Sequence, residues 1–142
     1  MNGFRRGQAS LEYMIMLALS LAVFSAILYV TSTLISTSSA QVGVDSAYRA
    51  VEKLRDASDF IYVHGHPSRT QVNIYIPPNV EEASILNNNT FNVRVGIGPS
   101  YTDIYSVSKG RVYGDLSGLV REGYYVFRVE SLSDTEINVT QI

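Results

Sequence analysis

The chain has 142 residues, a formal net charge of −2 and no cysteine. The lack of cysteine excludes disulfides, thiolate metal sites and cysteine nucleophiles, and the slightly acidic balance gives no electrostatic basis for nucleic-acid binding. Charged residues make up 17% of the chain, below the usual quarter, because residues 13–44 contain none.

The first seven residues form a short basic leader that contains Arg5 and Arg6 and ends at Gly7. An apolar segment follows from Leu11 to Ile35, with Glu12 as its single charge. A helix needs about 20 apolar residues to cross a bilayer, whereas the apolar core of a secretion signal has only about 7–15. The length therefore predicts a membrane-spanning helix. By the positive-inside rule, the leader lies in the cytoplasm and the rest of the chain outside.

Two features of the following stretch leave alternatives open. Small residues at Ser38 and Ala40, before Gln41, resemble a signal-peptidase site, so a secreted domain cut after Ala40 is one alternative. The hydroxyl-rich stretch from Thr31 to Ser39 is either a juxtamembrane segment leaving the bilayer or a surface for close helix–helix approach.

A second, amphipathic half of the helix is predicted beyond Gly43, where a bend is expected, with Pro67 as the firm stop. Apolar or small residues recur there at three- and four-residue steps and form one stripe: Val44, Ala47, Val51, Leu54, Ser58 and Ile61. Opposite charges four residues apart, Asp45–Arg49 and Arg55–Asp59, are expected to support the helix.

From about Phe60 the pattern changes to alternation, which predicts five to seven short strands in an antiparallel sheet or sandwich. The strand signals, separated by glycine and proline breakers, are Val72/Ile74/Ile76, Phe91/Val93/Val95/Ile97, Ile104, Tyr124–Val129 and Ile137/Val139. The expected fold class is therefore α+β. Its parts are a leader at 1–7, a long helix at 8–60 and a small antiparallel β-rich domain at 61–142.

Two sequons lie in the predicted outer domain, at Asn88 and Asn138, and are candidate N-glycosylation sites. The first falls in an expected turn at Asn87–Asn89, and the second in a strand with Asn138 and Thr140 facing out. Both become meaningful only if the domain is extracellular.

Several other residues are expected to be structural. His64 and His66 lack a third metal ligand and are predicted to belong to a loop, and Glu81-Glu82 to a solvated turn. Tyrosines are expected to form sheet, with stacking on sugars or on neighbouring subunits as the alternative: Tyr101, Tyr105, Tyr113 and Tyr125. No catalytic motif is present, so no enzymatic activity, cofactor or metal is expected.

Glu12 has two interpretations. A carboxylate costs about 2.5–3.5 kcal/mol at mid-bilayer, but Glu12 lies near the segment's end, where headgroups and the helix dipole reduce this cost. Alternatively, cleavage after Gly7 would give Gln8 a free amino group. That group could pair with Glu12 of a neighbouring subunit and set the axial register, because either charge alone is unfavourable in apolar surroundings.

Residues 6–13, Arg-Gly-Gln-Ala-Ser-Leu-Glu-Tyr, resemble the Q-x-S-x-E-Y pattern of class III signal peptides in archaeal type IV pilin-like proteins. The resemblance covers about the first 35 residues and implies cleavage between Gly7 and Gln8 by a prepilin peptidase. It makes Gln8, Ser10, Glu12 and Tyr13 the processing and assembly motif. It also implies membrane storage and then polymerisation by an assembly ATPase and a membrane platform protein.

The predicted function is that of a pilin, the structural subunit of an archaeal type IV pilus-like filament, adhesive rather than for swimming. Copies of this chain would polymerise through the apolar helix, since a helical array needs contacts that do not close. The precursor would reside in the cell membrane and the mature form in an extracellular filament. The alternative is a single-span or minor pilin-like protein that displays its β-domain for binding.

Overall fold

The computed structural model describes the backbone of residues 3–142 and the side chains from residue 8 onward. Met1 and Asn2 of the predicted leader lie outside the described residues, as do the side chains of residues 3–7. The chain divides into two compact units, Met1–Ser39 and Ala40–Ile142. Residues 3–142 form one helix and seven strands: α1 (Gly3–His64), β1 (Arg69–Ile76), β2 (Val80–Leu86), β3 (Thr90–Ile97), β4 (Ser100–Val107), β5 (Arg111–Gly114), β6 (Gly123–Ser131) and β7 (Glu136–Gln141).

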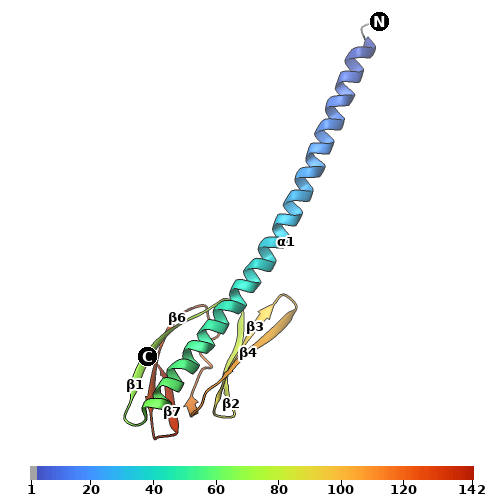
Figure 1. The fold of residues 1–142 in the computed structure, drawn as a ribbon. Coiled ribbons are helices and arrows are strands. Elements are labelled where there is room, and N and C mark those ends of the chain that lie inside the picture. Colours follow the sequence, from blue (N-terminus) through green and yellow to red (C-terminus); the bar gives the residue numbers. More distant parts are fainter. Residues whose placement is uncertain (1–2) are drawn as a thin grey trace. The chain divides into compact units, whose positions relative to one another are not determined.

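The predicted α+β class is confirmed (Figure 1). Helix α1 continues through Gly43 without interruption and ends at His64, beyond the predicted residue 60. Gly65 terminates it rather than Pro67, because Gly65 adopts a left-handed φ of 69° and its N–H donates to the Ile61 carbonyl at 3.0 Å. This is the αL cap, a conformation that glycine adopts without steric cost.

The strands of the second unit form two sheets. Four strands pair in the order β1-β6-β7-β5 and three in the order β2-β3-β4. All pairs are antiparallel except β5 with β7, which is parallel and departs from the antiparallel expectation. The exception arises because β5 follows β4 in sequence but pairs in the other sheet, next to β7.

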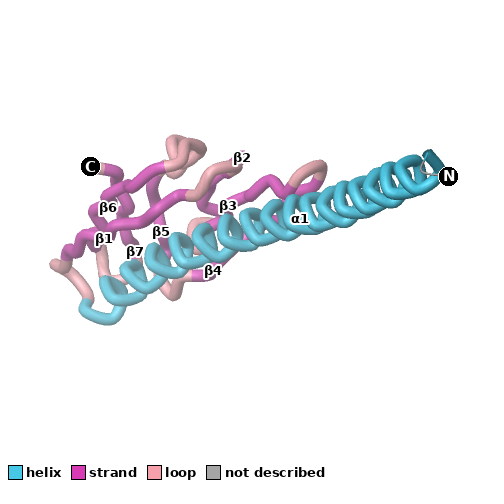
Figure 2. The backbone as a smooth tube through the Cα atoms, turned by 90° about the horizontal axis from the view of Figure 1, so that it is seen from above, coloured by secondary structure: helices cyan, strands magenta, loops and turns pink. Residues whose placement is uncertain are grey.

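The predicted amphipathic stripe packs against these sheets, as the C-terminal part of α1 lies along one side of the strands (Figure 2). Ala47, Val51, Leu54 and Ile61 are at most 1% exposed, while Val44 is partly buried. They share one core cluster with inward residues of both sheets, including Phe91 and Phe127. Because each fully buried side chain of this kind contributes about 1.5–3 kcal/mol, the helix is part of the domain core.

The predicted ion pairs along the helix are wrong. Arg55 pairs instead with Asp56 and Glu52, at 2.6 and 3.7 Å. Asp59 accepts hydrogen bonds from Ser108 Oγ at 3.0 Å and from the Lys109 amide at 2.8 Å, which ties the helix to the turn after β4. A buried hydroxyl and a backbone amide without other partners compete better for Asp59 than a solvated guanidinium does.

The stretch Glu81-Glu82 lies in strand β2 rather than in a turn, and this prediction is also wrong. The register shifts between Val80 and Glu82, so a bulge interrupts the inside–outside alternation that identifies a strand in sequence. Both glutamates are exposed, as expected of a solvated pair, and Glu82 lies opposite Arg94 of β3.

Substitution of Leu54 by Ala in a fragment of residues 40–142 should lower its free energy of unfolding by about 2–5 kcal/mol, because Leu54 is 1% exposed at the helix–sheet contact. Urea denaturation followed by circular dichroism measures the change. Arg49→Ala, at an exposed position on the same helix, should change stability by less than about 0.5 kcal/mol. Equal effects of the two substitutions would contradict the packing described above.

Candidate processing and assembly segment

The predicted motif residues lie at the start of the described part of α1, and all are exposed: Gln8, Ser10, Glu12 and Tyr13. Gln8 and Glu12 are one helical turn apart, and Gln8 Nε2 donates a hydrogen bond to Glu12 Oε1 at 3.4 Å. This bond is long compared with the usual 2.9–3.0 Å for N–H···O. The carboxylate therefore remains able to accept a stronger partner.

The apolar segment that follows has no cover within its own unit. Its large apolar side chains from Leu11 to Ile35 are 49 to 76% exposed. Within Gln8–His64 an 18-residue window reaches a mean hydropathy of 2.3, and none of it is buried. Such a helix is long and apolar enough to cross a membrane, and its surface is energetically unfavourable in water.

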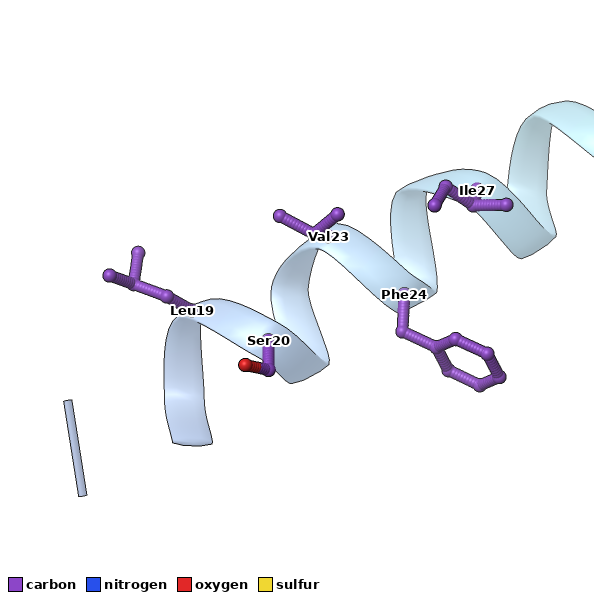
Figure 3. A pocket seen from close by; sticks show the side chains of 5 residues that line it. All are labelled: Leu19, Ser20, Val23, Phe24 and Ile27. Carbon is purple, nitrogen blue, oxygen red and sulfur yellow. The ribbon is translucent and has the colours of Figure 1, made fainter. Parts of the chain in front are cut away.

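The surface of this segment is grooved. Leu19, Val23 and Ile27 lie along one row at four-residue spacing, and Ser20 and Phe24 lie along the neighbouring row (Figure 3). Ridges and grooves of this kind allow helices to interdigitate. The small Ser20 beside the large Phe24 leaves a shallow depression on this surface.

Four hydroxyl groups along the segment and the hydroxyl-rich stretch donate hydrogen bonds within the helix. Ser20 and Ser25 donate to carbonyls four residues earlier at 2.8 Å, and Thr33 and Thr37 do so at 3.1 Å. A hydroxyl that is already hydrogen-bonded costs less to transfer into apolar surroundings. The hydroxyl-rich stretch is thus compatible with both environments considered for it, a membrane boundary and a helix–helix contact.

The alternative cleavage position after Ala40 lies inside α1, which is continuous from Ser38 through Gln41. The helix therefore offers no loop or extended segment at this point.

The two sequons occupy different environments. Asn88 is exposed in the hairpin turn between β2 and β3, where Asn87 and Asn88 have φ of 52° and 56°. Two successive left-handed residues define a type I′ turn, which confirms the predicted turn. Asn138 lies in β7 and is half-buried, and its Nδ2 donates to Thr140 Oγ1 at 3.1 Å.

Neither histidine lies in a metal cluster. His64 is the last residue of α1, not a loop residue, and its Nδ1 lies 2.8 Å from the Phe60 carbonyl oxygen. His66 is in the following loop, with Nδ1 3.2 Å from Ser131 Oγ. Among the described residues, no three His, Cys, Asp or Glu side chains gather closely enough to hold a metal ion.

Residues 5–31 match the class III signal peptide family. The chain carries a class III signal peptide. This segment is the hallmark of archaeal type IV pilin-like proteins, and it identifies the chain as a type IV pilin-like substrate of a prepilin peptidase. The match covers about a fifth of the chain. No curated protein and no solved structure shows significant similarity to the chain.

The signal peptide and the apolar helix together indicate a membrane-anchored precursor. They also imply that it is a substrate of a pilus assembly machinery. The match ends within the apolar segment, so the fold of the outer domain rests on the structure alone.

Substitution of Val23 by Arg should shift the precursor out of the membrane, since a charge at the centre of the span costs about 2.5–3.5 kcal/mol on insertion scales. The fraction of chain that resists alkaline carbonate extraction from isolated membranes measures the shift. Val42→Arg places the same side chain beyond the apolar segment and should leave extraction unchanged. If both variants remained membrane-bound like the wild type, the segment Leu11–Ile35 would not be the span.

Proposed function

We propose that the chain is the structural subunit of an archaeal type IV pilus-like surface filament with an adhesive role. The observation that carries the proposal is a class III signal peptide that continues into the uncovered apolar segment Leu11–Ile35, whose single charge is Glu12. A prepilin peptidase cuts between Gly7 and Gln8, and an assembly ATPase and a membrane platform protein then polymerise the mature chain. The role is structural, with neither catalysis nor a cofactor.

Polymerisation moves the apolar helix from lipid into a bundle of identical helices. Both surroundings remove the exposed side chains of Leu11–Ile35 from water, so the transfer has no large hydrophobic penalty. What changes is the contact between helices, where the grooved face around Ser20 and Phe24 fits another copy. The outer domain of residues 40–142 then forms the extracellular surface of the filament.

Glu12 sets the register of this bundle. After cleavage the Gln8 amino group is positive at neutral pH, and Glu12 of a neighbouring subunit is its partner. An unpaired carboxylate or ammonium in a helix bundle is strongly unfavourable. Subunits that align Gln8 with Glu12 are therefore favoured over subunits shifted along the axis.

Glycosylation at the sequons is part of the proposal. Asn88 is the better acceptor, because it is exposed in a hairpin turn and its side chain makes no hydrogen bond to another described residue. Asn138 lies between β5 and β6, and its amide is engaged by Thr140.

Replacement of Gly7 by Val should prevent removal of the leader, because the peptidase site implied by the signal peptide takes a small residue there. Intact-mass measurement of membrane-extracted protein checks this. The wild type should begin at Gln8 and the variant at Met1. Gly3→Val makes the same change four residues upstream and should be processed normally. A native filament whose subunits still carry Met1–Gly7 would refute the proposed maturation.

Replacement of Glu12 by Ala should leave membrane insertion and leader removal intact but abolish or disorder filaments, as seen by electron microscopy of sheared cell-surface material. Glu12→Gln should have the same effect, because the charge is what pairs with the Gln8 amine. The matched control is Asp45→Ala, since Asp45 accepts a similar i,i+4 bond from Gln41 at 3.0 Å outside the apolar segment. Normal filaments from both Glu12 variants would show that this pairing is not needed for assembly.

A further inference from the structure

Each sheet of the outer domain has an arginine on its outward face, on a strand with a neighbour on either side. In the three-stranded sheet this residue is Arg94, whose cross-strand neighbours are Glu82 and Asp103. Its Nε lies 2.7 Å from Asp103 Oδ1, its Nη1 lies 3.6 Å from Glu82, and the Tyr101 ring lies 4.4 Å from its guanidinium carbon. Asp103 further raises the pKa of Arg94, and Arg94 lowers the pKa of Asp103. The charge of Arg94 is thus satisfied within the domain.

The arginine of the four-stranded sheet is Arg128 on β6, and its surroundings are different. Its cross-strand neighbours are Gln71 and Thr140, which are both neutral. No carboxylate of the described chain lies within 4.0 Å of it, and its Nε is shielded from solvent without a hydrogen-bond partner. Glu130, on the same face, pairs instead with Arg69 at 3.2 Å.

A partly buried cation without a counter-ion favours an external anion. Folding has already removed water from part of the arginine side chain. A carboxylate that binds there therefore gains a charge-assisted hydrogen bond with a smaller further desolvation penalty than at a fully solvated arginine. The planar guanidinium suits a carboxylate in particular, because its two terminal Nη groups can donate in parallel to the two oxygens without involving the shielded Nε.

The same face carries an exposed aromatic surface. Tyr124 is 85% exposed and packs at a tilt beside Tyr75, with ring centroids 5.0 Å apart. Tyr75 is held in place because its hydroxyl donates to Glu122 Oε1 at 2.8 Å. Because the two rings are inclined by 48°, they do not form one flat surface. Tyr75 supports the Tyr124 ring, and the exposed face of Tyr124 is available for the C–H face of a sugar ring to stack on.

The separation of these two features indicates the size of the ligand. Tyr124 and Arg128 lie four residues apart on one strand, which corresponds to about 13 Å. Between and beside them are side chains that exchange hydrogen bonds with hydroxyl groups: Asn73, Gln71 and Thr140. The distance is spanned by several linked sugars rather than by one.

We propose that the outward face of β1, β6 and β7 binds an acidic polysaccharide, with a sugar carboxylate on Arg128 and a sugar ring on Tyr124. The inference rests on the adhesive role proposed above and names its ligand class, but it does not require polymerisation. An acidic peptide would supply the carboxylate but not the hydroxylated rings that the exposed Tyr124 ring and the amide side chains fit.

The test uses the full chain in detergent micelles, so that filament formation plays no part. Isothermal titration calorimetry compares oligomers of galacturonic acid with oligomers of galactose, which lack the carboxylate. The acidic oligomer should bind at least about tenfold more tightly, as expected for a charge-assisted hydrogen bond. Arg128→Gln should remove this preference, and Tyr124→Ala should weaken binding of both oligomers.

Arg94→Gln is the matched control, because it removes the corresponding arginine of the other sheet and should leave binding unchanged. If Arg128→Gln failed to fold by circular dichroism, loss of binding in Tyr124→Ala would still test the face, since that side chain is 85% exposed. Unchanged binding in either face variant, or equal loss in Arg94→Gln, would overturn the proposal.

Two other ligands for the same face are also tested, an acidic peptide and a glycan attached to Asn138. A poly-glutamate peptide that bound as tightly as the galacturonic acid oligomer would show an anion site without sugar selectivity and overturn the proposal. The proposal would also be overturned if native protein carried its own glycan on Asn138 and failed to bind the oligomer, while the Asn138→Gln variant bound it. A chain that bound the oligomer but never formed filaments would overturn the filament proposal and leave this one intact.

Discussion

The structure depends on one constraint, the need to keep the apolar surface of Leu11–Ile35 out of water. Along this segment the helix is apolar on every side, and none of the large side chains has cover within its unit. The helix satisfies its own interior backbone groups, and the hydroxyls of Ser20, Ser25 and Thr33 donate to its carbonyls, so the apolar surface is the main feature left to be accommodated. Lipid and a bundle of like helices both meet that requirement, and this is why a membrane-stored precursor and a polymer can share one segment.

The second half of the same helix packs against a folded domain instead of remaining uncovered. Its apolar stripe packs against the two sheets, while the charged side chains of this half lie on the remaining surface. Asp59 fastens this half to the turn after β4, and Gly65 ends it where the first strand must begin. One continuous helix thus has an uncovered apolar first half and contributes its second half to the core of a folded domain.

The two sheets show how similar positions acquire different roles through their neighbours. Arg94 and Arg128 both lie on outward faces, but acids flank the first and neutral side chains flank the second. The first therefore contributes to local structure, whereas the second has no carboxylate within 4.0 Å among the described residues. Tyr124, four residues earlier on the same strand, adds an exposed aromatic ring to the face that carries Arg128.

The helix, its amphipathic stripe, the strand signals and the turn at Asn87–Asn89 were predictable from the sequence, because each depends on periodicity or turn chemistry within a few residues. The processing motif was likewise readable, since it is a short contiguous pattern. Only the tertiary structure decided four other features. They are the partners of Asp59, the place of Glu82 in a bulged strand, the parallel pairing of β5 and the lack of a counter-ion for Arg128. These contacts join residues distant in the chain, and local patterns do not record which strands become neighbours.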